Sequence, residues 1–350
     1  MGRIRTIENY QGKKFELYGY KSNSGLYYLL AMPEQFNENC NMIVESYNSN
    51  GKQKESYEQN VVSALNDGNR IENFLMEVVT DAPIVMPITP DIIEGPDTQQ
   101  LSEESIMQEE IDTKFLSCIE EAKQKVQKIS GKKVGDKIFL DGYSASGVFA
   151  QRFALAYPEI IDRCLIGGAA GTIPIPSTEL DYPLGIGNYE ELFGKEFDEA
   201  AYKQIQFAYY VGEHEEREPG SYDINGDKII NDKQVAAPMH DMSYREITTK
   251  TEVGKKQREI LGETMDERYK NSIEYCKKIG IDISGIILRG AYHHGILDDK
   301  VNPSAEYLKN SILEFYYEGK QFKSDSVNCV EKLNETFQKN RNERNSTLEK

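Results

Sequence analysis

Tryptophan is absent from this 350-residue chain, histidine occurs only four times, and basic side chains are outnumbered by acidic ones. Lys and Arg total 41 against 58 Asp and Glu, so the formal net charge is −17. Phosphate-rich partners such as nucleic acids and anionic membrane surfaces need clustered Lys and Arg side chains. We therefore expect no nucleic-acid partner.

Long apolar runs are also missing, and none approaches the roughly 18 residues of a membrane-spanning helix. The N-terminal segment has no apolar stretch of the kind that a secretory signal needs. The five cysteines are an odd number, and consecutive ones lie at least 46 residues apart. That spacing contains no zinc-binding pair and favours free thiols in a reducing compartment. We expect a cytoplasmic protein without a membrane span.

Signals for a metal or a cofactor are equally sparse. Residues 223–232 resemble the start of a calcium loop, but Lys228 and Gln234 stand where such a loop needs Gly and Glu. No glycine-rich phosphate loop occurs. We expect no metal site and no cofactor.

What the chain does contain is a regular alternation of strand and helix patterns, with 22 Tyr and 13 Phe to fill a core. The strand patterns cover residues 14–21, 25–32, 42–47, 84–88, 137–140, 163–168, 206–212 and 283–289. The helix patterns cover residues 57–79, 102–127, 148–157, 252–278 and 304–317. This alternation predicts an α/β fold, a mostly parallel central sheet with helices on both faces, preceded by one antiparallel pair.

The whole of residues 1–320 is expected to form one domain. Prolines and glycines interrupt the alternation at 170–205, which we interpret as a lid-like excursion over the sheet. An acidic insertion follows at 213–245, and residues 321–350 are expected to be a polar C-terminal tail with at most a weak helix.

One serine motif lies between a predicted strand and a predicted helix. Gly142-Tyr143-Ser144-Ala145-Ser146-Gly147 is a G-x-S-x-S-G variant of the G-x-S-x-G nucleophile elbow. In such an elbow the serine projects from a sharp turn, and the N–H of the next residue, here Ala145, faces the developing oxyanion. Ser144 is therefore the candidate nucleophile, and Ser146 is the less favoured one because it lies further into the helix.

A serine nucleophile needs a base and an acid, which in this type of fold follow later strands in the order serine, acid, histidine. His293 and His294 come directly after the last predicted strand, and His293 is preferred. Glu215 lies three residues after Gly212, at the end of the preceding strand. Glu216 and Glu218 are its close competitors, and a plain solvated acidic loop would have the same composition.

On these motifs the chain resembles the α/β hydrolases, and within them the polyhydroxybutyrate-depolymerase-like and esterase-like bacterial members. The resemblance runs from about Phe15 to Tyr317 and rests on DGYSASGVFAQRFALAYPEIIDRCLIGGAAG, YPLGIGNYEELFGKEFD, QFAYYVGEHEE and GAYHHG. It implies catalytic roles for Ser144, His293 and Glu215, although the family has Asp at the last position and Gly at Ser146. The family's His-Gly pair after the third strand is replaced by Glu45-Ser46-Tyr47-Asn48, where a main-chain N–H near Asn48 would complete the oxyanion hole.

The sequence thus predicts a serine hydrolase that cleaves an ester or related acyl bond, with a small and neutral acyl substrate. The three departures from the family motif motivate an alternative. In that alternative the chain is a non-catalytic protein of the same fold that binds a small molecule or a protein partner.

Overall fold

The computed structural model describes ten stretches of the chain, and the following statements concern only these. They are residues 2–8, 12–49, 54–66, 81–93, 95–169, 173–214, 252–262, 265–292, 304–322 and 326–328. The chain divides into two compact units. The first contains residues 1–208 and 272–283, and the second contains residues 209–271 and 284–350.

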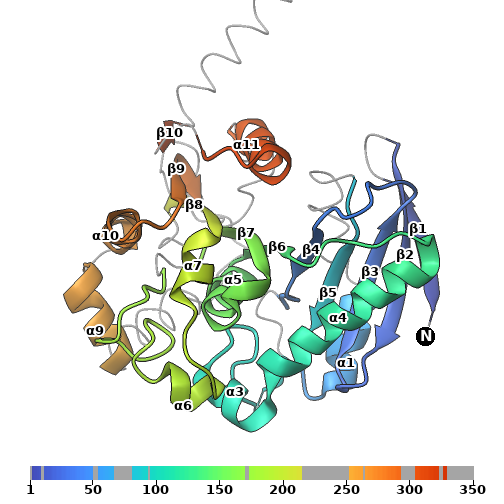
Figure 1. The fold of residues 1–350 in the computed structure, drawn as a ribbon, viewed down its shortest axis with the longest axis horizontal. Coiled ribbons are helices and arrows are strands. Elements are labelled where there is room, and N and C mark those ends of the chain that lie inside the picture. The colour runs from blue at the N-terminus through green and yellow to red at the C-terminus, as the bar shows by residue number, and fades with distance from the viewer. Residues whose placement is uncertain are drawn as a thin grey trace, which may run out of the picture. The chain divides into compact units, whose positions relative to one another are not determined.

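The sheet of the first unit has the strand order β1-β2-β3-β5-β4-β6-β7 (Figure 1). Its strands are β1 (Arg3–Glu8), β2 (Lys14–Lys21), β3 (Tyr27–Pro33), β4 (Met42–Glu45), β5 (Ile84–Ile88), β6 (Ile138–Tyr143) and β7 (Ile161–Gly167). β3 pairs antiparallel with β2 and β5, whereas β5, β4, β6 and β7 pair parallel to one another. The predicted antiparallel start and parallel continuation are confirmed.

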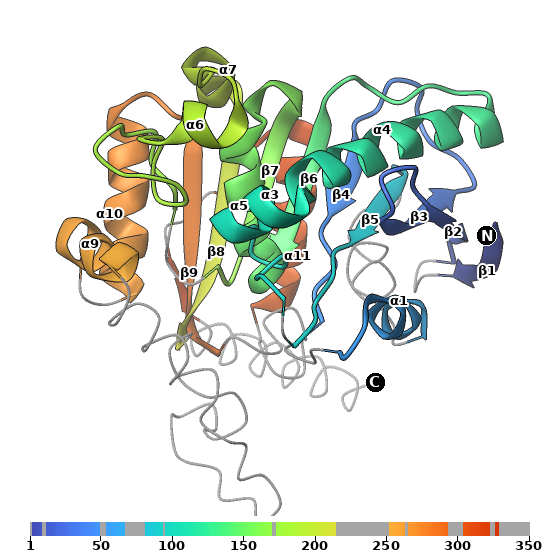
Figure 2. The same ribbon diagram turned by 90° about the horizontal axis from the view of Figure 1, so that it is seen from below.

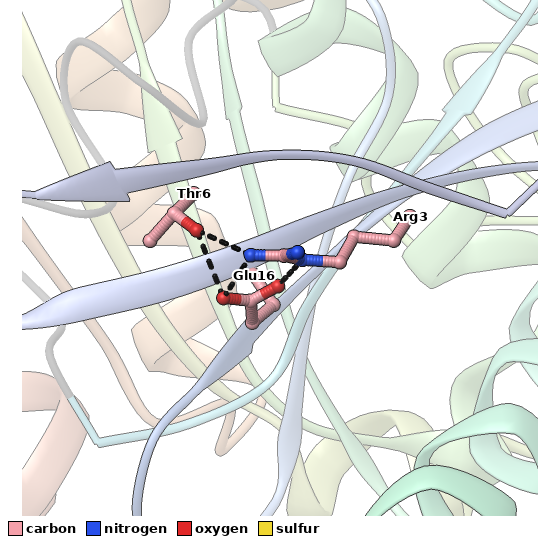
Figure 3. Close-up of polar contacts among 3 residues, drawn as sticks. All are labelled: Arg3, Thr6 and Glu16. Atoms are coloured by element: carbon pink, nitrogen blue, oxygen red, sulfur yellow. Dashed lines mark hydrogen bonds and ion pairs between the residues drawn. The ribbon is translucent and has the colours of Figure 1, made fainter.

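The edge strand β1 was not predicted, because its exposed and half-buried residues show no apolar alternation. It pairs antiparallel with β2. Figure 3 shows the polar contacts that accompany this pairing. Arg3 donates to both carboxylate oxygens of Glu16, one at 2.9 Å, and Thr6 Oγ1 donates to Glu16 Oε1 at 2.9 Å. These groups are exposed to water, so their net contribution to stability is small.

The helices α4 (Ile111–Ser130) and α5 (Ala145–Ala156) pack on the strands of the first unit and lie on the same side of them (Figure 2). The apolar stripe of α4 is buried as its helical spacing predicts, and Phe115 lies 4.6 Å from Phe149 and 4.9 Å from Phe153 between ring centroids. This aromatic contact joins α4 to α5 over the sheet.

The single helix predicted over 102–127 is wrong, because the structure has two helices there. α3 (Glu103–Glu109) begins after Ser102, whose side chain accepts a hydrogen bond from Ser105 N–H. It ends at Glu110, which has left-handed backbone angles of φ 50° and ψ 38°, and α4 starts immediately afterwards. Neither Gly nor Pro marks this break. The apolar periodicity continues across it and therefore predicts one uninterrupted helix.

The excursion at 170–205 contains α6 (Tyr189–Phe193) and α7 (Glu199–Gln204). Tyr189 Oη donates to Ala156 O at 2.6 Å, at the end of α5, and Lys195 pairs with Glu159 at 2.8 Å. These contacts attach the excursion to the C-terminal end of α5 and to the residues that follow it.

The second unit contains α9 (Glu252–Leu261), α11 (Ala305–Glu318), β10 (Ser326–Asn328) and parts of β8 (Gln206–His214), α10 (Met265–Lys278) and β9 (Ile283–Tyr292). β10 pairs parallel with β9, from Ser326 opposite Ile287 to Asn328 opposite Arg289. The polar tail predicted from residue 321 thus includes a strand, which its composition did not reveal. Among the described residues, none of the helices combines the length and apolar character needed to cross a membrane.

Candidate active site

The parallel strands β4, β5, β6 and β7 end at the same edge of the sheet, where ligands bind in folds of this type. Ser46–Ser49 follow β4, Thr89 follows β5, Ser144 follows β6 and Gly168 follows β7. Residues as far apart in the sequence as Ser46 and Gly168 therefore lie at the same end of the parallel strands, and Ser144 is among them.

Ser144 has a backbone conformation that few residues adopt, with φ 60° and ψ −125°. Among the described residues Glu110 also has positive φ, but it lies in the ordinary left-handed region, whereas Ser144 does not. Such strain costs about 1–3 kcal/mol and persists where the surroundings over-determine it. The Ser144 N–H donates to Gly167 O at 2.9 Å, and its carbonyl accepts from Val148 N–H at 3.0 Å. The serine hydroxyl does not cap α5.

Two glycines make this sharp turn possible. A Cβ on Gly142 would lie 2.1 Å from Ser146 O, and a Cβ on Gly147 would lie 2.7 Å from Gly167 O. Both contacts are with main-chain atoms, which cannot move aside as a flexible side chain could. Only glycine allows β6, α5 and β7 to approach this closely.

Ser146, the residue that departs from the family glycine, is part of the turn itself. Its Oγ accepts from Tyr143 N–H at 2.9 Å and donates to Tyr143 O at 2.8 Å. The side chain is fully buried. The hydroxyl closes the elbow, and Ser144 is the half-exposed serine of the motif.

Asn48, the candidate oxyanion residue of the sequence analysis, lies beside the elbow. Its Nδ2 donates to Tyr143 O at 2.9 Å, one residue before Ser144. Ala145 is the first residue of α5, and like Asn48 it is half-buried. The structure therefore brings Ser144, Ala145 and Asn48 together at one edge of the sheet.

A pair of acidic residues lies under the elbow, where sequence reasoning assigned no role. Glu45 and Asp141 occupy paired positions on β4 and β6, and both side chains are fully buried. Glu45 Oε1 is 3.5 Å from Ser146 Oγ. On the neighbouring strand, burial raises the pKa of the Cys164 thiol well above its usual value, and Asp141 raises it further. The sequence signal that could have indicated this pair is an acidic residue at the end of an otherwise apolar strand pattern.

Three further polar residues that sequence reasoning missed support the segment after β4. Ser49 contacts Asp91 and Gln99, which lie after β5 and in the loop before α3. Their position directly after a strand could have indicated Ser49 and Asp91. No pattern in the sequence points to Gln99.

The remaining predicted site residues lie outside the described residues. These are Glu215, Glu216, Glu218, His293 and His294. β8 ends at His214 and β9 ends at Tyr292, so the preferred acid and base each follow the last residue of a strand. The part of the chain that the structure does describe contains no cluster of three or more His, Cys, Asp or Glu side chains that could hold a metal ion.

A strained serine between a parallel strand and a helix, in a sheet that starts antiparallel, is the arrangement of an α/β-hydrolase fold. Several solved structures are similar to this chain over most of its length. A poly(aspartic acid) hydrolase-1 from Sphingomonas sp. KT-1 has 14% identity and a TM-score of 0.47, with 85% of this chain and 97% of that chain covered.

Two other solved structures have similarly low sequence identity to this chain and also cover most of its length. The poly(3-hydroxybutyrate) depolymerase LpqC from Bordetella parapertussis has 12% identity and a TM-score of 0.45, covering 89% of this chain and 91% of its own. Carboxyl esterase 2 from the fungus Tuber melanosporum has 10% identity and a TM-score of 0.46, covering 91% and 89%. No protein-family model matches the sequence, and no curated protein matches it either. The activities in these names are those of the proteins concerned.

Proposed function

We propose that the protein is a serine hydrolase that cleaves carboxylic esters or related acyl bonds, with Ser144 as the nucleophile. The observation that carries this proposal is the backbone of Ser144, held at φ 60° and ψ −125° by a hydrogen bond to β7 and by glycines that admit no Cβ. A strained residue at the binding edge of a sheet is typical of functional sites. A turn that served only to connect β6 with α5 would not need this conformation.

The proposed mechanism combines the geometry of the elbow with the roles that the sequence analysis assigns to His293 and Glu215. Ser144 Oγ attacks the acyl carbonyl while His293 takes its proton, and Glu215 orients the imidazole and stabilises its protonated form. The N–H groups of Ala145 and Asn48 stabilise the oxyanion of the tetrahedral intermediate. His293 then gives the proton to the leaving group, and water releases the acyl group from Ser144. His294, Glu216 and Glu218 are the alternates for the base and the acid.

The proposed substrate is a small neutral acyl compound. Acidic residues make up much of the stretch 213–232, which follows β8 and includes the proposed triad acid. A negative field near the site lowers the local concentration of anionic substrates. No cofactor takes part in the proposed reaction.

Labelling with a fluorophosphonate probe tests the role of Ser144, because such probes bond covalently to activated serines. The wild type is expected to be labelled and Ser144→Ala is expected to lose all labelling. Ser146→Ala is the matched control, since it removes the neighbouring hydroxyl of the same motif. Equal labelling of wild type and Ser144→Ala would exclude Ser144 as the nucleophile. No labelling of the folded wild type would exclude the proposed function and favour the non-catalytic alternative.

A further inference from the structure

The segment after β4 is held by groups from two other parts of the first unit. Tyr47 N–H donates to Pro87 O at 3.1 Å, within β5. Ser49 N–H donates to Gln99 Oε1 at 3.3 Å, and Ser49 Oγ lies 3.4 Å from the same oxygen. The Ser49 hydroxyl also donates to a carboxylate oxygen of Asp91. Both neighbours of Asn48 are therefore fixed in place.

The residues that hold Ser49 are themselves anchored. Lys54 N–H donates to Asp91 O at 2.9 Å, which ties the start of that loop to the chain beyond β4. Thr98 Oγ1 donates to Pro90 O, which ties the loop that carries Gln99 to the end of β5. Both partners of Ser49 therefore lie in segments that have hydrogen bonds of their own to the rest of the first unit.

Burial makes these bonds effective. Ser49 is 5% exposed and Gln99 is 6% exposed, so water competes little for either side chain. Hydrogen bonds to a carboxylate in such surroundings are stronger than those between neutral groups in water.

The amide nitrogen of Gln99 is buried with no hydrogen-bond partner in the described part of the chain. An unpaired buried donor is unfavourable, and an apolar residue of similar size would avoid it. The role of Gln99 therefore depends on its side-chain oxygen, which accepts the hydrogen bond from Ser49 N–H.

Asn48 lies between the two fixed residues, and its own side chain is bonded to Tyr143 O in the elbow. The Asn48 peptide is thereby set relative to Ser144 from both sides. An error of about 1 Å in a catalytic arrangement can lower the rate about a hundredfold.

We propose that Asp91 and Gln99, acting through Ser49, are positioning residues for the oxyanion donor at Asn48. This inference rests on the proposed function, since it assigns the cluster to the acyl-transfer site. None of the three side chains is required to touch the substrate. Their effect is expected on the stabilisation of the transition state, and only weakly on the binding of the ester.

The test compares Ser49→Ala with Ser49→Thr, which keeps the hydroxyl, and with Ser105→Ala. Ser105, in α3, is a matched control because it is also a buried serine, and its hydroxyl donates to Ser102 O at 2.7 Å. With p-nitrophenyl acetate, Ser49→Ala is expected to lower kcat about tenfold or more, with KM within about twofold of wild type. Ser49→Thr is expected to recover most of kcat, and Ser105→Ala to keep all of it.

Wild-type kcat in Ser49→Ala, or an equal loss in Ser105→Ala, would overturn the inference. Amide hydrogen exchange of a peptide covering residues 43–49 supplies a readout that needs no activity. It is expected to be faster in Ser49→Ala and unchanged in Ser105→Ala. If the wild type shows no Ser144-dependent hydrolysis, the proposed function fails by itself. Exchange then decides whether the cluster holds the segment: faster exchange in Ser49→Ala alone supports it, and unchanged exchange excludes it.

Discussion

The hydroxyl of Ser146 bridges both main-chain groups of Tyr143, with its oxygen 2.9 Å from the nitrogen and 2.8 Å from the carbonyl oxygen. This pair of bonds closes the elbow directly under Ser144. Ser146→Ala would remove both of these hydrogen bonds from the turn. We expect a loss of about 1–3 kcal/mol in the free energy of unfolding, because each intramolecular hydrogen bond contributes about 0.5–1.5 kcal/mol.

Urea unfolding measures that loss, and fluorophosphonate labelling of the same variant separates stability from chemistry. The folded Ser146→Ala protein is expected to be labelled, since Ser144 is still present. A variant that is stable but cannot be labelled would make Ser146, rather than Ser144, the reactive serine.

Gly142 is expected to tolerate no side chain at all. A Cβ there would lie 2.1 Å from a main-chain oxygen, and no rotamer change can relieve that contact. We expect Gly142→Ala to cost more than about 3 kcal/mol, beyond the usual range for overpacking. Gly194→Ala is the control, because Gly194 has φ +64° with open space around it, so that only the backbone conformation is penalised, by about 1–2 kcal/mol. Equal losses in chemical denaturation would show that the close approach at Gly142 does not limit stability.

Four cysteines are expected to be unreactive in the folded protein. Burial raises the pKa of the Cys40 thiol to about 11 and the pKa values of Cys118 and Cys276 to about 12, and it raises that of Cys164 well above its usual value. At pH 8 at most about one thiol in a thousand would then be a thiolate, which is the reactive form.

Mass mapping after brief treatment with a thiol reagent at pH 8 checks this expectation. Cys329 lies outside the described residues, and a Cys329→Ser background confines the experiment to the other four. No label is expected on the native protein and full label after denaturation in guanidinium. Rapid native labelling of Cys118 or Cys276 would mean that their helices open easily.

Local pattern was sufficient to predict the elbow and all of the described strands except β1 and β10, because these features depend on residues close in sequence. The spacing of Gly142 and Ser144 predicted a sharp turn, and the apolar stripe that includes Phe115 predicted one face of a helix. The break at Glu110 was missed because it depends on backbone angles that a glutamate rarely adopts. Gln99 was missed for a different reason. Its partner Ser49 lies 50 residues away, and no periodicity encodes such a contact.

Charge is expected to decide between otherwise equal substrates. The acidic stretch after β8 disfavours an anionic ester near the proposed site, so a neutral ester should be hydrolysed faster than an analogue with a remote carboxylate. The comparison of kcat/KM at low and high salt checks the cause, because screening weakens a field effect. Faster hydrolysis of the anionic ester at low salt would contradict the proposed preference.

The two adjacent histidines provide the sharpest separation of catalytic from bystander residues. Both His293 and His294 follow β9, so single alanine variants differ in position by only one residue. His293→Ala is expected to lower kcat/KM by on the order of 10⁴-fold or more, because Ser144 loses its base, whereas His294→Ala should stay within a few-fold of wild type. Among the acids, Glu215→Gln should be much more damaging than Glu216→Gln or Glu218→Gln, because the amide cannot stabilise the imidazolium. A large loss in His294→Ala alone would transfer the role of the base to His294.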